Sequence, residues 1–256
     1  ILPGAATFTD PATLLIDERP VRARSYLVAI GAEPHVPAIP GLEHVDYLTS
    51  TTAMELTELP ASLVVIGGGF VGLEQAQLFA RLGVAVTIIG RLAPHAEPEL
   101  SSELRKAFLS EGITVVGDRA ATIIQDDGVV RVRTRTGKAV TGERVLIATG
   151  RTPRANGLDL AAAGVATDDR GFIIVDEQQR TTNPVVFAAG DVTDVPQYVY
   201  VAAMAGKIAA RNALGHHEQV DYTGLPSVLF TAPQLGSAGI TEAEAIAAGY
   251  RCACRY

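Results

Sequence analysis

The most constraining feature of the sequence is a glycine-rich turn between an apolar run and an amphipathic segment, within Leu63–Glu74. Gly67, Gly69 and Gly72 have GxGxxG spacing. In a strand–turn–helix unit, the first glycine permits the turn, the second lets a pyrophosphate approach the backbone, and the third lets the helix pack on the strand. A purely structural glycine turn is the alternative, but the strand and helix signals on both sides favour a dinucleotide-binding site.

The next predicted strand, Val84–Ile89, indicates which dinucleotide is bound. NAD-binding units place a carboxylate about 20 residues after the glycines, where it accepts the ribose hydroxyls. Gly90 stands there instead, and Arg91 follows. No carboxylate repels a 2′-phosphate and a guanidinium can bind it, which favours NADPH over NADH. A solvated surface arginine is the alternative for Arg91.

Strand and helix signals alternate over residues 59–150, which predicts an α/β fold with a parallel sheet covered on both faces. A helix is expected at 99–111, and turn signals break the following segment into a β-meander. The predicted strand that exits at Gly150 repeats the pattern of the one that exits at Gly31. This repetition suggests a nucleotide-binding domain inserted into another domain.

After the insertion, the sequence predicts a buried strand at Val185–Asp191. Gly190 permits close backbone approach, and Asp191 stands at the carboxyl end of the strand, where open α/β sheets bind ligands. A helix expected to begin near Pro196 would aim its positive end back at the same place. A turn or N-cap role is the alternative for Asp191.

These signals divide the chain into residues 1–58, an inserted domain at 59–150, a return segment at 151–221, and the opening of a third domain at 222–256. A helix with a hydroxyl N-cap is expected just after residues 49–52. The chain starts at Ile1 and stops at Tyr256 inside strand-like runs. We therefore expect it to be part of a longer protein.

Composition excludes several classes of function. The formal net charge is −7, so the basic surplus that nucleic acid or an anionic membrane would attract is missing. We find no signal peptide and no apolar run near the roughly 20 residues of a membrane span, and expect a cytoplasmic protein. The only cysteines, Cys252 and Cys254, would share one face of a strand; we expect ordinary strand residues, and an incomplete soft-metal site is the alternative.

Four motifs stand in a shared order: VAIGA around Ala29, VVIGGGFVGLE, VLIATGRTP ending at Pro153, and VFAAGDV ending at Val192. With them the whole chain resembles the flavin-dependent pyridine nucleotide-disulfide oxidoreductases. The resemblance implies an NADPH-binding Rossmann-like domain inserted in a partial FAD-binding domain, followed by the start of an α+β dimerisation domain that makes a homodimer.

The resemblance also implies roles for matched residues. Asp191 would bind the ribityl chain of FAD, and the following helix would direct its dipole at the pyrimidine end of the flavin. Glu74 would pair with a lysine beside the redox cysteines and lie next to the nicotinamide. The other expected cofactor-binding positions are Gly31, Gly67, Gly69, Gly72, Arg91, Gly150 and Gly190.

Residues Thr193–Gly206 and Leu225–Gly239 are most similar to the members of this family that reduce mercury(II). Such a protein moves electrons from NADPH through FAD and a cysteine pair to thiolate-bound Hg(II), giving Hg(0). The redox CxxxxC motif and the first FAD-binding GxGxxG do not occur in this sequence, so the chain alone is not expected to turn over. The alternatives are an NADH-dependent enzyme like dihydrolipoamide dehydrogenase and a non-catalytic nucleotide-binding redox sensor.

Overall fold

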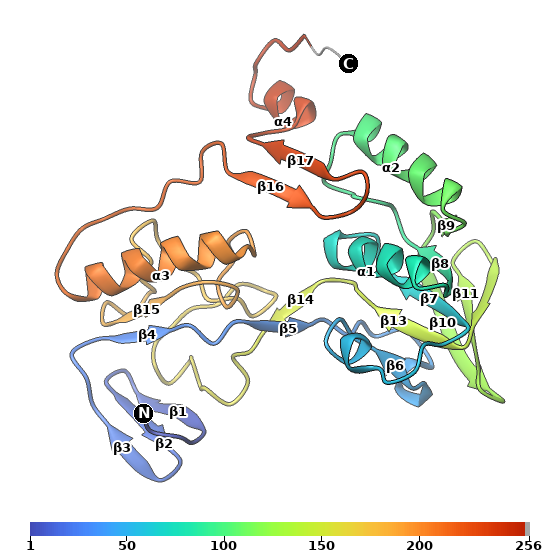
Figure 1. The fold of residues 1–256 in the computed structure, drawn as a ribbon. Coiled ribbons are helices and arrows are strands. Elements are labelled where there is room, and N and C mark those ends of the chain that lie inside the picture. The colour runs from blue at the N-terminus through green and yellow to red at the C-terminus, as the bar shows by residue number, and fades with distance from the viewer. Residues whose placement is uncertain (254–256) are drawn as a thin grey trace. The chain divides into compact units, whose positions relative to one another are not determined.

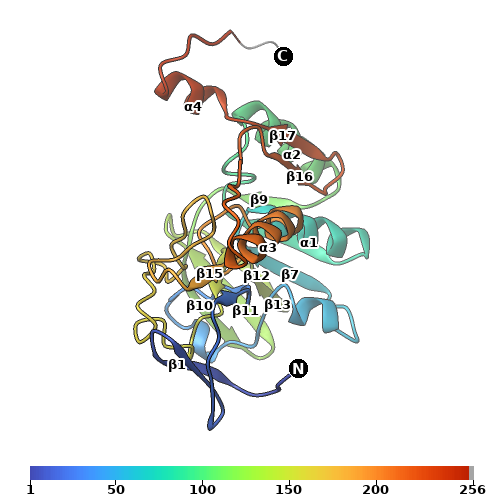
Figure 2. The same ribbon diagram turned by 90° about the vertical axis from the view of Figure 1, so that its left-hand side faces the viewer.

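The computed structural model describes residues 1–253. The chain forms two compact units, each built from two segments. The flanking unit comprises Ile1–Glu33 and Arg151–Tyr222, and the glycine-turn unit comprises Pro34–Gly150 and the described residues from Thr223 onward. Figures 1 and 2 show the elements of both units. The α/β fold class expected from the sequence is confirmed.

A five-stranded parallel sheet forms the centre of the glycine-turn unit, in the order β6-β13-β7-β8-β9. Helices α1 and α2 pack against β7, β8 and β9 (Figure 1). The bounds are β6 Tyr47–Leu48, β7 Ser62–Ile66, α1 Phe70–Arg81, β8 Ala85–Ile89, α2 Pro98–Ser110, β9 Thr114–Val116 and β13 Arg144–Ile147.

Both faces of this sheet are buried, which explains the continuous apolar runs of its strands. In β7, Leu63 and Val65 join the core cluster that includes Leu73 of α1 and Phe108 of α2. The alternate residues of β7 face the three-stranded meander β10 Ala120–Asp126, β11 Val129–Thr134 and β12 Ala139–Gly142. The two-sided sheet and the meander agree with the sequence prediction.

The flanking unit holds a parallel pair of β4 (Tyr26–Val28) and β15 (Val186–Ala188), with α3 (Val199–Ala213) against both strands. Phe8 packs in the same core cluster as Tyr26 and Val186. The remaining strands form an antiparallel sheet of β1 Ala6–Asp10, β2 Thr13–Ile16 and β3 Arg19–Val21, and a pair of β5 Ala32–Pro34 with β14 Arg151–Pro153.

The compact units do not divide the chain at the expected boundaries. Residues 34–58 belong to the glycine-turn unit, because β6 pairs with β13 of the central sheet. The segment from Thr223 also belongs to this unit; it forms the hairpin of β16 (Pro226–Leu229) and β17 (Leu235–Ala238), followed by α4 (Glu242–Ala247). The backbone pairing that sets these limits is not visible in the local sequence.

Three local expectations need correction. The helix expected after residues 49–52 is only a 3-10 turn, η2 Thr52–Glu55, one of two such turns with η1 Leu42–His44. Helix α3 begins at Val199, three residues after Pro196. Residues 251–253 form no strand, so the predicted strand is wrong around the exposed Cys252, and Cys254 lies outside the described residues.

Within residues 1–253, no helix combines the length and the apolar character that a membrane crossing requires. The same residues contain no group of three or more histidine, cysteine, aspartate or glutamate side chains that could hold a metal ion.

Candidate functional site

The three motif glycines have different surroundings. Gly67 has φ 121°, and a Cβ there would lie 2.1 Å from the Ala148 carbonyl oxygen. A Cβ at Gly72 would lie 2.4 Å from the Gly67 carbonyl oxygen, so α1 packs directly on the turn. At Gly69, by contrast, no atom of the described chain beyond its two sequence neighbours lies within 4 Å of the Cβ position. Gly67 and Gly72 therefore serve packing, whereas Gly69 leaves space at the start of the helix.

That space lies at the N-terminus of α1. The N-cap residue, Gly69, provides no side-chain acceptor, and the first turn contains no acidic residue. The first backbone N–H groups of a helix lack partners within the helix, and the helix dipole favours an anion beside them. Open space at Gly69 with donors directed into it fits a pyrophosphate.

The structure supplies a backbone reason for the glycine at position 90. Gly90 has φ 154°, and a Cβ there would lie 2.9 Å from the Gly68 backbone nitrogen. A residue with a carboxylate side chain would be strained at this position and would collide with the glycine turn. The missing carboxylate thus follows from packing as well as from any preference for a cofactor.

Arg91 lies beside the glycine turn. A Cβ at Gly68 would lie 2.1 Å from the Arg91 carbonyl oxygen, so the two backbones are in close approach. The exposed guanidinium donates from Nη2 to the Pro94 carbonyl oxygen at 3.0 Å. This contact holds the guanidinium on the loop that follows β8, at the edge where parallel sheets bind ligands.

Glu74 extends from α1 toward the segment that follows β16. Its Oε1 accepts a hydrogen bond of 2.9 Å from the backbone N–H of Phe230. The half-buried carboxylate is therefore held by the chain 156 residues further on.

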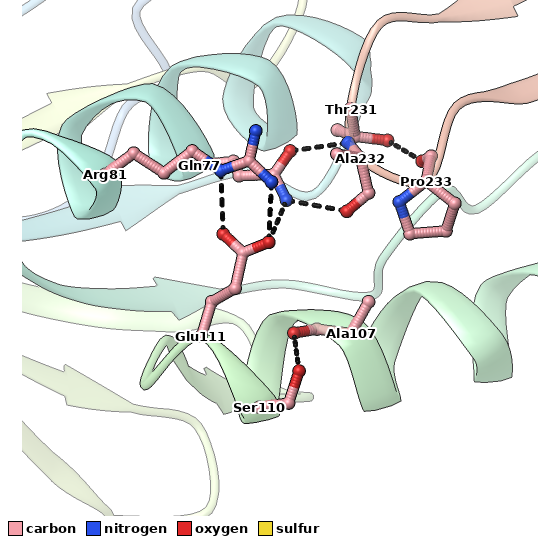
Figure 3. A network of polar contacts seen from close by, with 8 residues as sticks. All are labelled: Gln77, Arg81, Ala107, Ser110, Glu111, Thr231, Ala232 and Pro233. Atoms are coloured by element: carbon pink, nitrogen blue, oxygen red, sulfur yellow. Dashed lines mark hydrogen bonds and ion pairs between the residues drawn. The ribbon is translucent and has the colours of Figure 1, made fainter.

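One turn further along α1, Gln77 makes a network that the sequence reasoning missed (Figure 3). Gln77 is 3% exposed. Its Oε1 accepts from the Ala232 N–H at 2.7 Å, and its Nε2 donates to the Ala232 carbonyl at 2.8 Å and to Glu111 Oε1 at 2.9 Å. Arg81 donates two hydrogen bonds to the same carboxylate, at 2.7 and 3.0 Å. These bonds from Arg81 lower the pKa of Glu111.

A second cluster lies in the flanking unit. Gly190 has φ 77° and lies two residues after the end of β15. The Asp191 carboxylate lies 3.4 Å from Arg151 Nε, and Arg151 Nη2 donates to the Ala32 carbonyl oxygen at 2.6 Å. Within the described chain, Arg151 Nε is buried and forms no hydrogen bond. Arg151 is part of the GRTP motif, but sequence reasoning gave it no role because its partner is 40 residues away.

Helix α3 follows this cluster with a start similar to that of α1. Its N-cap, Tyr198, makes no side-chain capping bond in the described structure, and its first turn contains no acidic residue. The rings of Tyr198 and Tyr200 stack with their centroids 5.3 Å apart. The positive end of the α3 dipole can therefore stabilise negative charge on a group placed beside it.

The structure thus collects the expected site residues in two places. Gly67, Gly69, Gly72 and Arg91 lie around the turn between β7 and α1, with Glu74 on the same helix. Gly31, Gly190 and Asp191 belong to the flanking unit, and Gly150, with φ 125°, ends the Pro34–Gly150 segment. No described atom would meet a Cβ within 4 Å at either Gly31 or Gly150.

Known proteins resemble this chain over most of its length. Residues 1–206 match the model of the family described as pyridine nucleotide-disulphide oxidoreductase. A mercuric reductase of Streptomyces lividans is 48% identical over 97% of this chain and 55% of the relative, and one of Bacillus cereus is 40% identical over 98% of this chain and 41% of the relative. The chain therefore spans about half the length of these relatives.

A solved structure gives the same assignment. The HOCl-induced flavoprotein disulfide reductase RclA of Escherichia coli matches with a TM-score of 0.87 and 28% identity, over 96% of this chain and 58% of that protein. The glycine turn, the fold and the sequence identity all indicate the same protein family. This chain belongs to the pyridine nucleotide-disulphide oxidoreductase family.

Proposed function

We propose that this chain carries the NADPH site and part of the FAD site of an oxidoreductase that reduces mercury(II). The main support for this proposal is the turn between β7 and α1. Two of its motif glycines are enclosed by backbone, whereas Gly69 leaves open space at the N-terminus of the helix. The choice of mercury(II) as substrate is supported by relatives named mercuric reductase, which match nearly the whole of this chain.

In the NADPH site, the N–H groups at the start of α1 donate to the pyrophosphate, and Gly69 lets it approach the backbone. Arg91 binds the 2′-phosphate from the loop after β8, where Gly90 leaves no carboxylate to repel it. Glu74 would lie beside the nicotinamide, as the family resemblance implies. We assign residues 59–150 to this domain, with the 34–58 segment packed on it.

In the FAD site, formed by parts of residues 1–58 and 151–221, the Asp191 carboxylate accepts hydrogen bonds from ribityl hydroxyls. The Arg151 guanidinium lies beside that carboxylate and balances its negative charge. The start of α3 would stabilise negative charge on the flavin ring. When bound, NADPH supplies a hydride and FAD accepts its two electrons.

The substrate is Hg(II) delivered as a thiolate complex, because thiolates are the soft ligands that this metal requires. The redox cysteine pair belongs to the longer protein. We also propose a cytoplasmic homodimer with no nucleic-acid or membrane partner. The exposed Phe230, Ile240, Ile246 and Tyr250 in the segment after Thr223 support an assembly surface there.

The test is mercury-dependent oxidation of NADPH by the full-length protein in excess thiol, measured at 340 nm. We expect oxidation to require mercury and to be faster with NADPH than with NADH. Activity with dihydrolipoamide or glutathione disulfide and none with mercury would replace the substrate by a disulfide. A bound flavin that NADPH and NADH both fail to reduce would favour the non-catalytic redox sensor.

A further inference from the structure

The segment after β16 is anchored to the glycine-turn unit through its interior. Leu229, at the end of β16, is 1% exposed and belongs to the same core cluster as Leu73 of α1 and Leu63 of β7. Leu235 of β17 packs against this cluster as well. Burial of such side chains supplies much of the attachment, but it does not fix the rotation of the backbone between them.

Two side chains of α1 fix that backbone. Glu74 and Gln77 are three residues apart and therefore lie on one face of the helix. They accept hydrogen bonds from the N–H groups of Phe230 and Ala232, which are two residues apart in the segment that follows β16. Gln77 also donates to the Ala232 carbonyl, so one side chain satisfies both backbone groups of that residue.

Glu111 decides which way the Gln77 amide points. An ionised carboxylate can only accept hydrogen bonds, so the amide nitrogen must face Glu111 and the oxygen must face the Ala232 N–H. Arg81 keeps the carboxylate ionised through its two hydrogen bonds. Figure 3 shows Gln77 bonded to both Ala232 and Glu111, and Arg81 bonded to the same Glu111 carboxylate.

We propose that Gln77 is a positioning residue for the nicotinamide end of the NADPH site. By holding Ala232, it places the Phe230 N–H against Glu74 and so fixes the direction of the Glu74 carboxylate. This inference rests on the proposed NADPH site. Gln77 lies two turns beyond Gly69 and does not touch the phosphate-binding turn, so it affects alignment for hydride transfer and leaves the binding affinity unchanged.

The test uses Gln77→Met in the full-length flavoprotein, with Gln75→Met as the matched control. Methionine keeps the length and volume but cannot hydrogen-bond, and leaves the Ala232 groups without their partner. Gln75 is on the same helix, and its Nε2 donates to the Ser50 carbonyl at 2.9 Å, away from this segment. Comparing the two variants distinguishes the effect of losing this network from the effect of losing any glutamine on α1.

Two measurements are made without mercury. Amide hydrogen exchange in residues 226–235 of the NADPH-free protein is expected to be about tenfold faster in Gln77→Met and unchanged in Gln75→Met. Flavin reduction at saturating NADPH, followed by stopped flow, is expected to slow about tenfold in Gln77→Met, with the NADPH dissociation constant within about twofold of wild type. Glu111→Gln serves as a second variant in case Gln77→Met folds poorly. It frees the Gln77 amide to rotate, and flavin reduction is expected to slow about threefold.

Faster exchange with unchanged flavin reduction would overturn the positioning role, as would unchanged exchange in both Gln77→Met and Glu111→Gln. A rise in the NADPH dissociation constant that matches the slowing would also overturn it, because the role would then be in binding. If NADPH does not reduce the wild-type flavin, the proposed function fails and the positioning role fails with it. The exchange comparison would still decide whether Gln77 holds the segment.

Discussion

The junction between β7 and α1 and the junction between β15 and α3 both place a glycine with positive φ after a parallel strand. At the first junction, Gly67 is followed almost at once by a helix, and backbone atoms fill the space around Gly67 while Gly69 leaves space open. At the second, Gly190 is followed by the carboxylate of Asp191, and the helix begins only at Val199. The two junctions share a glycine with positive φ after a strand, but they present different chemical groups to a ligand.

The difference matches the groups that each junction would bind. A pyrophosphate carries negative charge and accepts hydrogen bonds, so it suits a turn of backbone N–H donors without acidic side chains. A ribityl chain carries hydroxyl groups, which donate to a carboxylate such as Asp191 held by Arg151. The first junction excludes side chains and the second depends on one. Adding a side chain should therefore damage the first junction, and changing the Asp191 side chain should damage the second.

The largest effect is expected at Gly67. Gly67→Ala would place a Cβ 2.1 Å from the Ala148 carbonyl oxygen at φ 121°, which should cost about 3 kcal/mol of stability and abolish NADPH binding. Urea unfolding and NADPH titration of the full-length protein measure both. Gly69→Ala is the control: its Cβ meets no described atom within 4 Å, so stability should stay within about 0.5 kcal/mol while NADPH affinity falls at least tenfold. Equal stability losses in the two variants would contradict the distinction between packing and approach.

The second effect concerns charge beside the first junction. Arg91→Glu should lower kcat/KM for NADPH about a hundredfold and leave kcat/KM for NADH within about threefold, because only NADPH has the 2′-phosphate. Steady-state kinetics of the full-length protein with both nucleotides measure the ratio. Arg105→Glu, an exposed arginine on α2, makes the same change in net charge and should leave the ratio unchanged. An equal loss with both nucleotides would assign Arg91 to the loop rather than to the phosphate.

The sequence predicted the first junction more completely than its surroundings. The glycine spacing predicts the turn and the helix start because both are local features, although the clearance at Gly67 is set by the distant Ala148. The pairing of β6 with β13 and the contact of Gln77 with Ala232 join residues about 100 and 155 positions apart. Gln77 looks like any polar residue on an amphipathic helix, so no local signal separated it from Gln75. Likewise, the packing that requires glycine at position 90 involves Gly68, 22 residues earlier.

At the second junction, Asp191→Asn should weaken FAD binding about tenfold, because the carboxylate loses its charge and one of its two acceptor oxygens becomes a donor. Fluorescence of released flavin in dialysed full-length protein measures the dissociation constant. Asp169→Asn, an exposed aspartate of the same unit, is the matched control and should bind FAD as wild type does. If the two variants retain FAD equally, the carboxylate at this junction has a role in the turn and none in flavin binding.

The smallest expected effect concerns how the stability of the contacts made by α1 and by α3 depends on pH. Near the C-terminal end of α3, the buried Asn212 amide donates to the Gln178 and Glu218 carbonyls and does not titrate. On α1, Gln77 and Arg81 bind Glu111, whose pKa is below its usual value of 4.5, chiefly because of the hydrogen bonds from Arg81. A carboxyl with a lowered folded-state pKa stabilises the fold fully above the unfolded pKa, and this contribution is lost as the pH falls through the folded pKa.

We therefore expect the glycine-turn unit to lose up to about 1 kcal/mol between pH 6 and pH 3 through Glu111, since the pair is partly solvated. Urea unfolding of wild type and Glu111→Gln at both pH values measures the difference, and the stability of Glu111→Gln should fall less with pH. Glu103→Gln is the control, because Glu103 forms an exposed ion pair with Lys106 on the same α2 helix. If Glu103→Gln reduces the pH dependence as much as Glu111→Gln does, the effect belongs to the general charge of α2, and the contrast between the attachments of α1 and α3 fails.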